Sequence, residues 1–276
     1  MWQAEHVASL LRVVDPSIAV ELVIVDTQAD RRLDVPIHEL GGKGVFAKEV
    51  QAAVLDGRAD IAVHSAKDLP SVTIPGLVLA AVPERGDPRD ALVGSTLAEL
   101  PEGAEVATGS LRRRAELWRH RPDLRVAELR GNMQTRLSKA AHHDAIVVAA
   151  TALDRLGLAD EIAERLPVDV MVPQVAQAAL GVECRDGDGE LLDVLARIED
   201  TATRRCVDAE RAFLAELGGD CSLPAGAHAV VEGSGLMVAA FLGAPDARTT
   251  VRASAVGEGP AVGTALAADL RDRLGA

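Results

Sequence analysis

Tyrosine is absent from this sequence, and only three phenylalanines and two tryptophans occur among its 276 residues. Proteins that bind single-stranded nucleic acids commonly stack the bases on aromatic side chains, so such a binding surface would be poorly equipped here. The formal net charge of -13 also disfavours nucleic acids and anionic membranes as partners of the whole surface. We therefore expect no nucleic-acid partner.

Long hydrophobic runs are missing as well. No apolar stretch approaches the roughly 20 residues of a membrane-spanning helix. The longest, residues 145–153, suits a buried strand followed by the start of a helix. Near the N-terminus, Glu5 and His6 stand where a secretion signal would be cationic and then apolar. These features predict a cytoplasmic protein with no membrane partner.

Cysteine is scarce, with Cys184, Cys206 and Cys221 far apart and in no CxxC arrangement. Neither a disulfide framework nor a metal site is therefore predicted. Cys184 and Cys206 are interpreted as packing residues. Cys221 lies in the loop sequence Gly-Gly-Asp-Cys-Ser-Leu-Pro, where an electrophile could reach its thiolate, although a lone loop cysteine is more often incidental than functional.

Apolar residues make up 48% of the chain, which is enough for buried cores, and the length predicts two or three domains. Short β-rich runs of the kind buried in parallel sheets alternate with helical patterns, as in doubly wound α/β sheets. The expected strands are residues 20–25, 60–65, 77–82, 105–108, 125–129 and 144–149. The expected helices between them are residues 44–56, 111–118 and 132–141.

Two further features predict the domain boundaries. Residues 83–90 combine two prolines, a glycine and dense charge, which is typical of a hinge. After residue 184 the pattern changes to helices at 190–198 and 201–217, strands at 227–232, 235–242 and 249–255, and a closing helix, which indicates a small α+β domain. We expect domain 1 at residues 1–84 and 179–198, domain 2 at 88–175 and domain 3 at 200–276.

Charged residues follow two of the expected strands. Lys67 and Asp68 come after the strand at 60–65, and Arg155 follows the strand at 144–149. Ligands of open α/β sheets bind beyond the carboxyl ends of the strands, so these side chains could face a common cleft between two domains. Each of them alone could also be an ordinary surface charge.

Between residues 110 and 140 there are nine Lys or Arg against three acids, a local net charge of +6 in an acidic protein. Arginine binds carboxylates through two hydrogen bonds and stays charged in a cleft. A concave anion site is one interpretation, and a solvated helix face with ion pairs is the other.

Several long runs resemble the hydroxymethylbilane synthase (porphobilinogen deaminase) family, in the same order and at similar spacing over nearly the whole chain. They read GGKGVFAKEV, DIAVHSAKDLPS, ERGDPRDALV, ATGSLRRRAEL, RPDLRVAELRGNMQTRLSK, LDRLGL, GVECR and GGDCSLPAGAHA. The resemblance implies two domains like periplasmic binding proteins with the active cleft between them, and a small C-terminal domain. It also implies a monomeric transferase that condenses four porphobilinogen molecules into hydroxymethylbilane and releases ammonia.

The resemblance further implies a dipyrromethane cofactor, made from the substrate itself and bound through a thioether to Cys221. Asp68 matches the catalytic aspartate of the family, and Gln177 matches a polar residue near the cofactor. The carboxylate-binding positions of the family match Lys67, Ser65, Thr108, Ser110, Arg112, Arg113, Arg130, Arg136 and Arg155.

This assignment gives the candidate residues a chemical role. Positive charge develops on the pyrrole nitrogens as each carbon–carbon bond forms, and a fixed carboxylate at Asp68 can stabilise it. Each pyrrole also carries an acetate and a propionate, so the product is a polyanion and the arginines around Arg112 supply the opposite charge.

Two departures from the family pattern stand out. The usual N-terminal strand and the turn after it are missing, which would leave a sheet position empty and backbone groups unpaired; a misassigned start is one explanation. Ala176 and Ala178 also replace usual glycines.

Two other functions remain possible from the sequence: a solute-binding protein without catalysis, and a nucleic-acid-binding module that uses the arginines.

Overall fold

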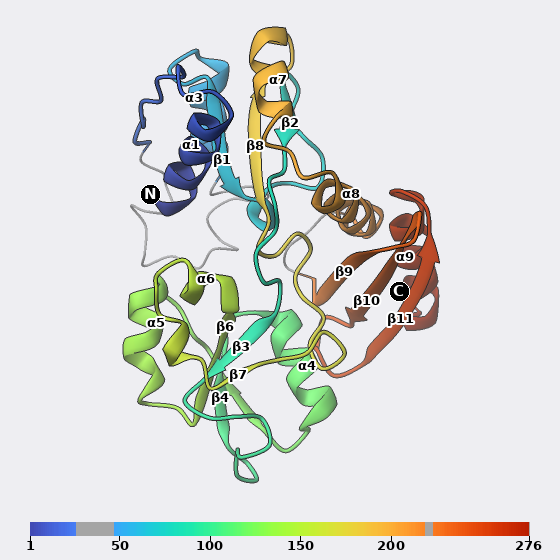
Figure 1. The fold of residues 1–276 in the computed structure, drawn as a ribbon. Helices are drawn as coiled ribbons and strands as arrows, with labels where there is room; N and C mark the ends of the chain where they lie inside the picture. The colour runs from blue at the N-terminus through green and yellow to red at the C-terminus, as the bar shows by residue number, and fades with distance from the viewer. Residues whose placement is uncertain (26–46, 219–222, 276) are drawn as a thin grey trace. The chain divides into compact units, whose positions relative to one another are not determined.

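The computed structural model describes residues 1–25, 47–218 and 223–275. The chain folds as two compact units, one formed by Met1–Arg85 with Ala179–Arg205 and the other by Gly86–Ala178 with Cys206–Ala276 (Figure 1). The chain first crosses from unit 1 to unit 2 between Arg85 and Gly86, which lie within the predicted hinge at residues 83–90. The division into three domains stays a prediction.

The described residues of unit 1 form a three-stranded sheet covered by helices on both faces. Strand β8 lies between β1 and β2 and runs antiparallel to both. Val7 and Leu11 of α1 pack with Leu195 of α7 against one face, and Val54 of α3 packs against the other. The elements are α1 (Trp2–Val14), α3 (Lys48–Leu55), β1 (Ile61–Ser65), β2 (Leu77–Ala81), β8 (Leu180–Arg185) and α7 (Gly189–Ala196).

Two expectations for this unit are wrong. Residues 20–25 form no strand: Val20 packs on the core, but Leu22, Val23 and Ile24 are exposed. A β-rich run becomes a strand only where a neighbour supplies its hydrogen bonds, and no described strand pairs with this one. The sheet is also not parallel, because the segment that returns from unit 2 enters it as the antiparallel β8.

Unit 2 contains a five-stranded sheet in the order β5-β4-β6-β3-β7. Strands β5, β4 and β6 are parallel, while β3 runs antiparallel to β6 and β7. Leu117 of α4 packs on one face, and Leu137 of α5 and Leu153 of α6 pack on the other (Figure 1). The elements are β3 (Asp90–Val93), β4 (Glu105–Ala107), α4 (Leu111–His120), β5 (Arg125–Ala127), α5 (Met133–Ala140), β6 (Ala145–Ala149), α6 (Ala150–Asp154) and β7 (Glu164–Arg165).

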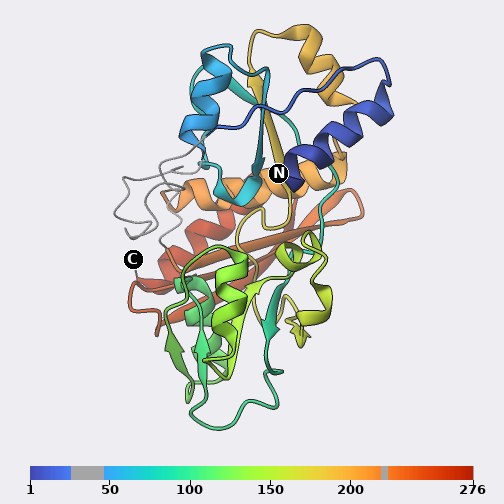
Figure 2. The same cartoon turned by 90° about the vertical axis from the view of Figure 1, so that its left-hand side faces the viewer.

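The C-terminal part of unit 2 is the predicted small α+β fold. Its antiparallel sheet, in the order β11-β10-β9, is covered by α9 (Figure 2). Phe241 on β10 packs with Ala115 of α4. The elements are β9 (Ala225–Glu232), β10 (Gly235–Gly243), β11 (Thr250–Gly257) and α9 (Ala261–Leu274). The helix before them, α8 (Thr201–Glu216), begins in unit 1 and continues into unit 2. The mixed α/β class with a small α+β part at the C-terminus is thus confirmed. Across the described ranges, no helix has the length and apolar character needed to cross a membrane.

Candidate functional site

The candidate residues of unit 2 gather at the carboxyl edge of its parallel strands. Thr108 follows β4, and its backbone N–H donates to Ala127 O, the last residue of β5, at 2.9 Å. Asp90 at the start of β3 pairs with Ala149, the last residue of β6, so it lies at the same edge. This edge is where open α/β sheets bind ligands.

Two helices begin at this edge with capped N-termini. Ser110 caps α4 by accepting from Arg113 N, and Asn132 caps α5 by accepting from Thr135 N at 2.9 Å. The N-terminus of a helix carries partial positive charge and exposed N–H groups, so it attracts anions. Arg112 and Arg113, in the first turn of α4, add full positive charges to that end.

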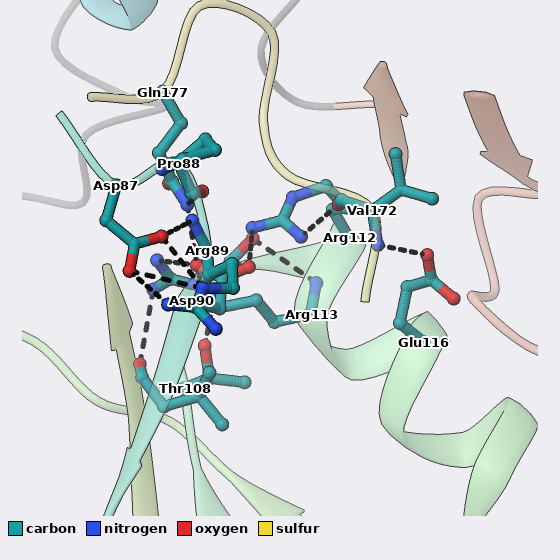
Figure 3. A network of polar contacts seen from close by, with 12 residues as sticks. Asp87, Pro88, Arg89, Asp90, Thr108, Arg112, Arg113, Glu116, Val172 and Gln177 are labelled. Carbon is teal, nitrogen blue, oxygen red and sulfur yellow. Dashed lines mark hydrogen bonds and ion pairs between the residues drawn. The ribbon is translucent and has the colours of Figure 1, made fainter. Parts of the chain in front are cut away.

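Asp90 is the centre of a buried polar network (Figure 3). Its Oδ2 accepts from Arg112 Nη2 at 2.6 Å, and its Oδ1 accepts from Arg113 Nη2 at 2.8 Å and from Gln177 Nε2 at 2.9 Å. Arg112 also donates to Val172 O and Arg113 to Val147 O. The three side chains that the sequence assigns to cofactor and carboxylate binding are therefore held together by one carboxylate.

The charges in this network do not cancel. Burial alone would raise the pKa of Asp90, but Arg112, Arg113 and the hydrogen bond from Gln177 hold it well below its usual range. Burial also lowers the pKa of Arg113, although Asp90 opposes this effect. Two guanidinium groups share this one carboxylate, so the cluster has an excess positive charge. Because buried charge is costly unless it is paired, the cluster suits an additional carboxylate from a ligand.

Replacing Asp90 should destabilise the protein strongly. D90N would leave two buried guanidinium groups without their carboxylate, and breaking a buried pair in this way costs about 3–5 kcal/mol. Urea unfolding at pH 7 measures the loss. The folded-state pKa of Asp90 is depressed, so its contribution is complete above the unfolded value of 3.8 and is lost as the pH falls below it. The difference between wild type and D90N should therefore shrink in acid.

Asp87 provides the matched control for this substitution. It binds Arg89 in the same loop and Arg165 on β7, but its side chain is 20% exposed. Solvent weakens such pairs, so D87N should cost about 1 kcal/mol or less. Equal losses in D87N and D90N would contradict the interpretation that buried charge dominates at Asp90.

The backbone on either side of Gln177 shows why glycine is usual at positions 176 and 178 in the family. Ala176 has φ 57° and Ala178 has φ 71°, in the left-handed region that glycine adopts without steric cost. Ala178 O accepts a hydrogen bond from Arg155 Nη2 at 2.7 Å, and burial lowers the pKa of Arg155. This strained segment thus links Arg155 to the Asp90 network.

Gly226 on β9 brings the C-terminal sheet close to Arg112. A Cβ atom at this position would lie 2.6 Å from Pro173 O, 2.9 Å from Arg112 Cδ and 2.9 Å from Val172 O. We expect G226A to displace the acceptor of Arg112 and to destabilise the protein by about 1–3 kcal/mol, as overpacking does. Thermal unfolding measures this effect. G187A is the control, because a Cβ there meets nothing within 4 Å, and an equal loss in G187A would contradict the prediction.

In unit 1 the candidate residues lie where β1 ends. Ser65 is the last residue of β1, and Lys67 and Asp68 form a 3-10 turn with Ala66. Ala66 N donates to Ala179 O at 3.0 Å and Leu69 is buried, so both ends of the turn are anchored. Asp68 itself is exposed.

The remaining candidates lie beyond β5 or outside the described residues. The side chain of Arg130 is 51% exposed, and Arg136 Nε donates to Gly131 O at 2.8 Å. Cys221 lies outside the described residues. Cys184 and Cys206 are buried, which confirms them as packing residues, and burial raises the pKa of the Cys184 thiol.

Asp90 is the residue that the sequence analysis missed. It stands in the run ERGDPRDALV, directly before the apolar Ala-Leu-Val of β3, where an acid would normally be costly to bury. A buried acid needs a cationic partner, and the two consecutive arginines Arg112 and Arg113 could have indicated one. The distance of more than 20 residues along the chain hid this pairing.

Comparisons with known proteins agree along the whole chain. Residues 1–193 match the family model described as porphobilinogen deaminase, dipyromethane cofactor binding domain, and residues 204–272 match porphobilinogen deaminase, C-terminal domain. The curated porphobilinogen deaminase of Syntrophotalea carbinolica is 46% identical over 281 residues, covering 99% of this chain and 89% of the relative. That of Roseiflexus castenholzii is 46% identical over 280 residues, covering 99% and 92%.

Solved structures show only a weak likeness. The periplasmic VFT2 domain of Bordetella pertussis BvgS is 20% identical, with a TM-score of 0.39 over 71% of this chain and 75% of that chain. An ancestral cationic amino acid solute binding protein is 16% identical, with a TM-score of 0.39 over 71% and 77%. These scores are too low to carry an inference about function.

Proposed function

Because the chain belongs to the porphobilinogen deaminase family, we propose that Asp68, Cys221 and the arginines of unit 2 carry out this family's reaction here. That reaction condenses four porphobilinogen molecules into hydroxymethylbilane and releases ammonia. The observation that best supports the proposal is the excess positive charge around Asp90, because substrate and product are both carboxylates.

The residues of unit 2 fit a dipyrromethane. Two linked pyrroles carry four carboxylates, and the carboxyl edge of the sheet offers the hydroxyls of Thr108 and Ser110 and the helix N-terminus behind them. Arg112 and Arg113 form the buried part of a carboxylate site. The exposed Arg130, with Arg136 and Arg155, would bind carboxylates nearer to solvent.

Each part of unit 2 has a separate task in this proposal. Arg112 and Arg113 would orient one carboxylate, because Asp90 fixes the direction of their guanidinium groups. Gln177 would position Asp90, since its amide nitrogen donates to Pro88 O and to Asp90 Oδ1. When bound, the dipyrromethane provides the pyrrole carbon to which the growing chain is joined. Cys221 would hold that group through its sulfur.

Asp68 is the proposed catalytic residue. Its carboxylate would stabilise the positive charge that develops on a pyrrole nitrogen and would assist the transfer of protons during condensation. Lys67 and Ser65, from the same anchored turn, would bind substrate carboxylates.

The wild-type protein tests the overall proposal. Incubation with porphobilinogen should release ammonia and form a linear tetrapyrrole, and intact mass under reducing conditions should exceed the sequence mass by two linked pyrrole units. Absence of both results would contradict the proposal.

We also propose that the protein is a cytoplasmic monomer. Light scattering after gel filtration tests the oligomeric state, and cell fractionation tests the localisation.

A further inference from the structure

One carboxylate in unit 2 stands among the arginines at the carboxyl edge without belonging to the Asp90 network. Glu128 follows β5, and its Oε1 accepts from Arg114 Nη2 at 2.6 Å. Its Oε2 lies 4.0 Å from Arg130 Nε. Its side chain is 54% exposed, so ligands and solvent reach it.

Glu128 lies close to the loop between β4 and α4. A Cβ atom at Gly109 would stand 3.7 Å from Glu128 Oε2 and 2.7 Å from Leu129 O, so these two loops touch. The neighbours of Gly109 are Thr108 and Ser110, the two candidate hydroxyls. A carboxylate therefore occupies a place next to groups that suit the carboxylate of a ligand.

Arg114 holds Glu128 in this position. Its guanidinium lies 5.8 Å from the ring centroid of Trp118, within the range of a cation–π contact, and its Nε is buried without a hydrogen-bond partner among the described residues. Glu128 Oε1 thus contacts Arg114 at 2.6 Å, whereas Glu128 Oε2 lies at the longer distance of 4.0 Å from Arg130.

We propose that Glu128 competes with substrate carboxylates for Arg130 and so limits how tightly the pyrroles are held. The inference rests on the proposed function, in which Arg130 binds carboxylates. Glu128 repels a second carboxylate at Arg130, and Arg114 moderates this competition by drawing Glu128 toward itself. Weaker binding favours exchange of the pyrroles over retention.

The test compares two substitutions that remove the same charge. E128Q should lower the KM for porphobilinogen by about two- to fivefold, the range of an exposed ion pair, with kcat changed less. E102Q is the matched control, because Glu102 is exposed in the turn before β4, at the opposite edge of the sheet. The effect should fade in about 0.5 M salt, which screens exposed charges. An unchanged or higher KM in E128Q overturns the proposal.

A second comparison isolates Arg114. R114Q should raise the KM, since it frees Glu128 to pair with Arg130, but R114Q in the E128Q background should change little. An equal rise in both backgrounds would show that Arg114 acts on the substrate directly and would overturn the assignment to Glu128.

A binding measurement separates this inference from the proposed function. Calorimetric titration with an unreactive pyrrole that carries an acetate and a propionate gives a Kd that does not depend on turnover. If the wild type binds the probe but does not process porphobilinogen, the catalytic proposal fails while the Kd of E128Q still tests Glu128. Equal Kd values for wild type, E128Q and E102Q overturn the role of Glu128, whether or not turnover occurs.

Discussion

Replacing Asp68 by asparagine should reduce the turnover of porphobilinogen by at least about a hundredfold, because the substitution removes the negative charge and the proton acceptor but keeps the shape. The measurement is the rate of ammonia release and of tetrapyrrole formation under saturating substrate. Asp68 is exposed in a turn that is anchored through Ala66 and Leu69, so the fold should survive. Circular dichroism and the unfolding midpoint should match the wild type.

Asp60 is the control for this prediction. It lies just before β1, at the opposite end of the strand from Asp68, and its side chain is 82% exposed. D60N removes the same charge from the same unit, and it loses only an exposed pair with Arg185. We expect near-normal turnover in D60N. Normal turnover in D68N, or an equal loss in both variants, would remove Asp68 from the catalytic role.

Changing Cys221 to serine should abolish the covalent adduct and with it the activity. A serine hydroxyl is a far weaker nucleophile than a thiolate at neutral pH, so the thioether should not form. The measurement is the intact mass of the purified variant under reducing conditions. We expect the mass of the bare chain, whereas the wild type should carry two additional pyrrole units.

The other two cysteines provide controls of the same chemical type. Cys184 and Cys206 are buried, and burial raises the pKa of the Cys184 thiol, so both should be unreactive. C184S and C206S should keep the mass excess, although a hydroxyl in an apolar core costs some stability. A mass excess that persists in C221S, or that disappears in C184S, would place the attachment elsewhere.

The regular elements were largely predictable from local patterns. The expected helix at residues 111–118 is observed as Leu111–His120, and the expected strand at 144–149 is observed as Ala145–Ala149. The C-terminal elements also agree to within about two residues, which is the usual uncertainty of helix and strand ends. Periodic apolar residues and turn residues act over a few positions, so they can be read without knowing the fold.

Pairing between distant segments was less predictable. Residues 20–25 have the composition of a strand, yet they form none in the structure, because strand formation also depends on which neighbour is available. For the same reason, the antiparallel direction of β8 and β3 did not follow from their apolar sequences. A buried strand has the same residue pattern in either direction.

The sequence by itself determined the family, the α/β class and the set of residues that carry charge, because long motifs and local periodicity contain that information. Only the tertiary structure decided that Arg112, Arg113 and Gln177 meet on Asp90, and that Glu128 stands between Arg114 and Arg130. These contacts join segments 14 to 87 residues apart, apart from the near neighbours Glu128 and Arg130. The energy of each charge depends on its burial and on its partners, and folding alone sets both.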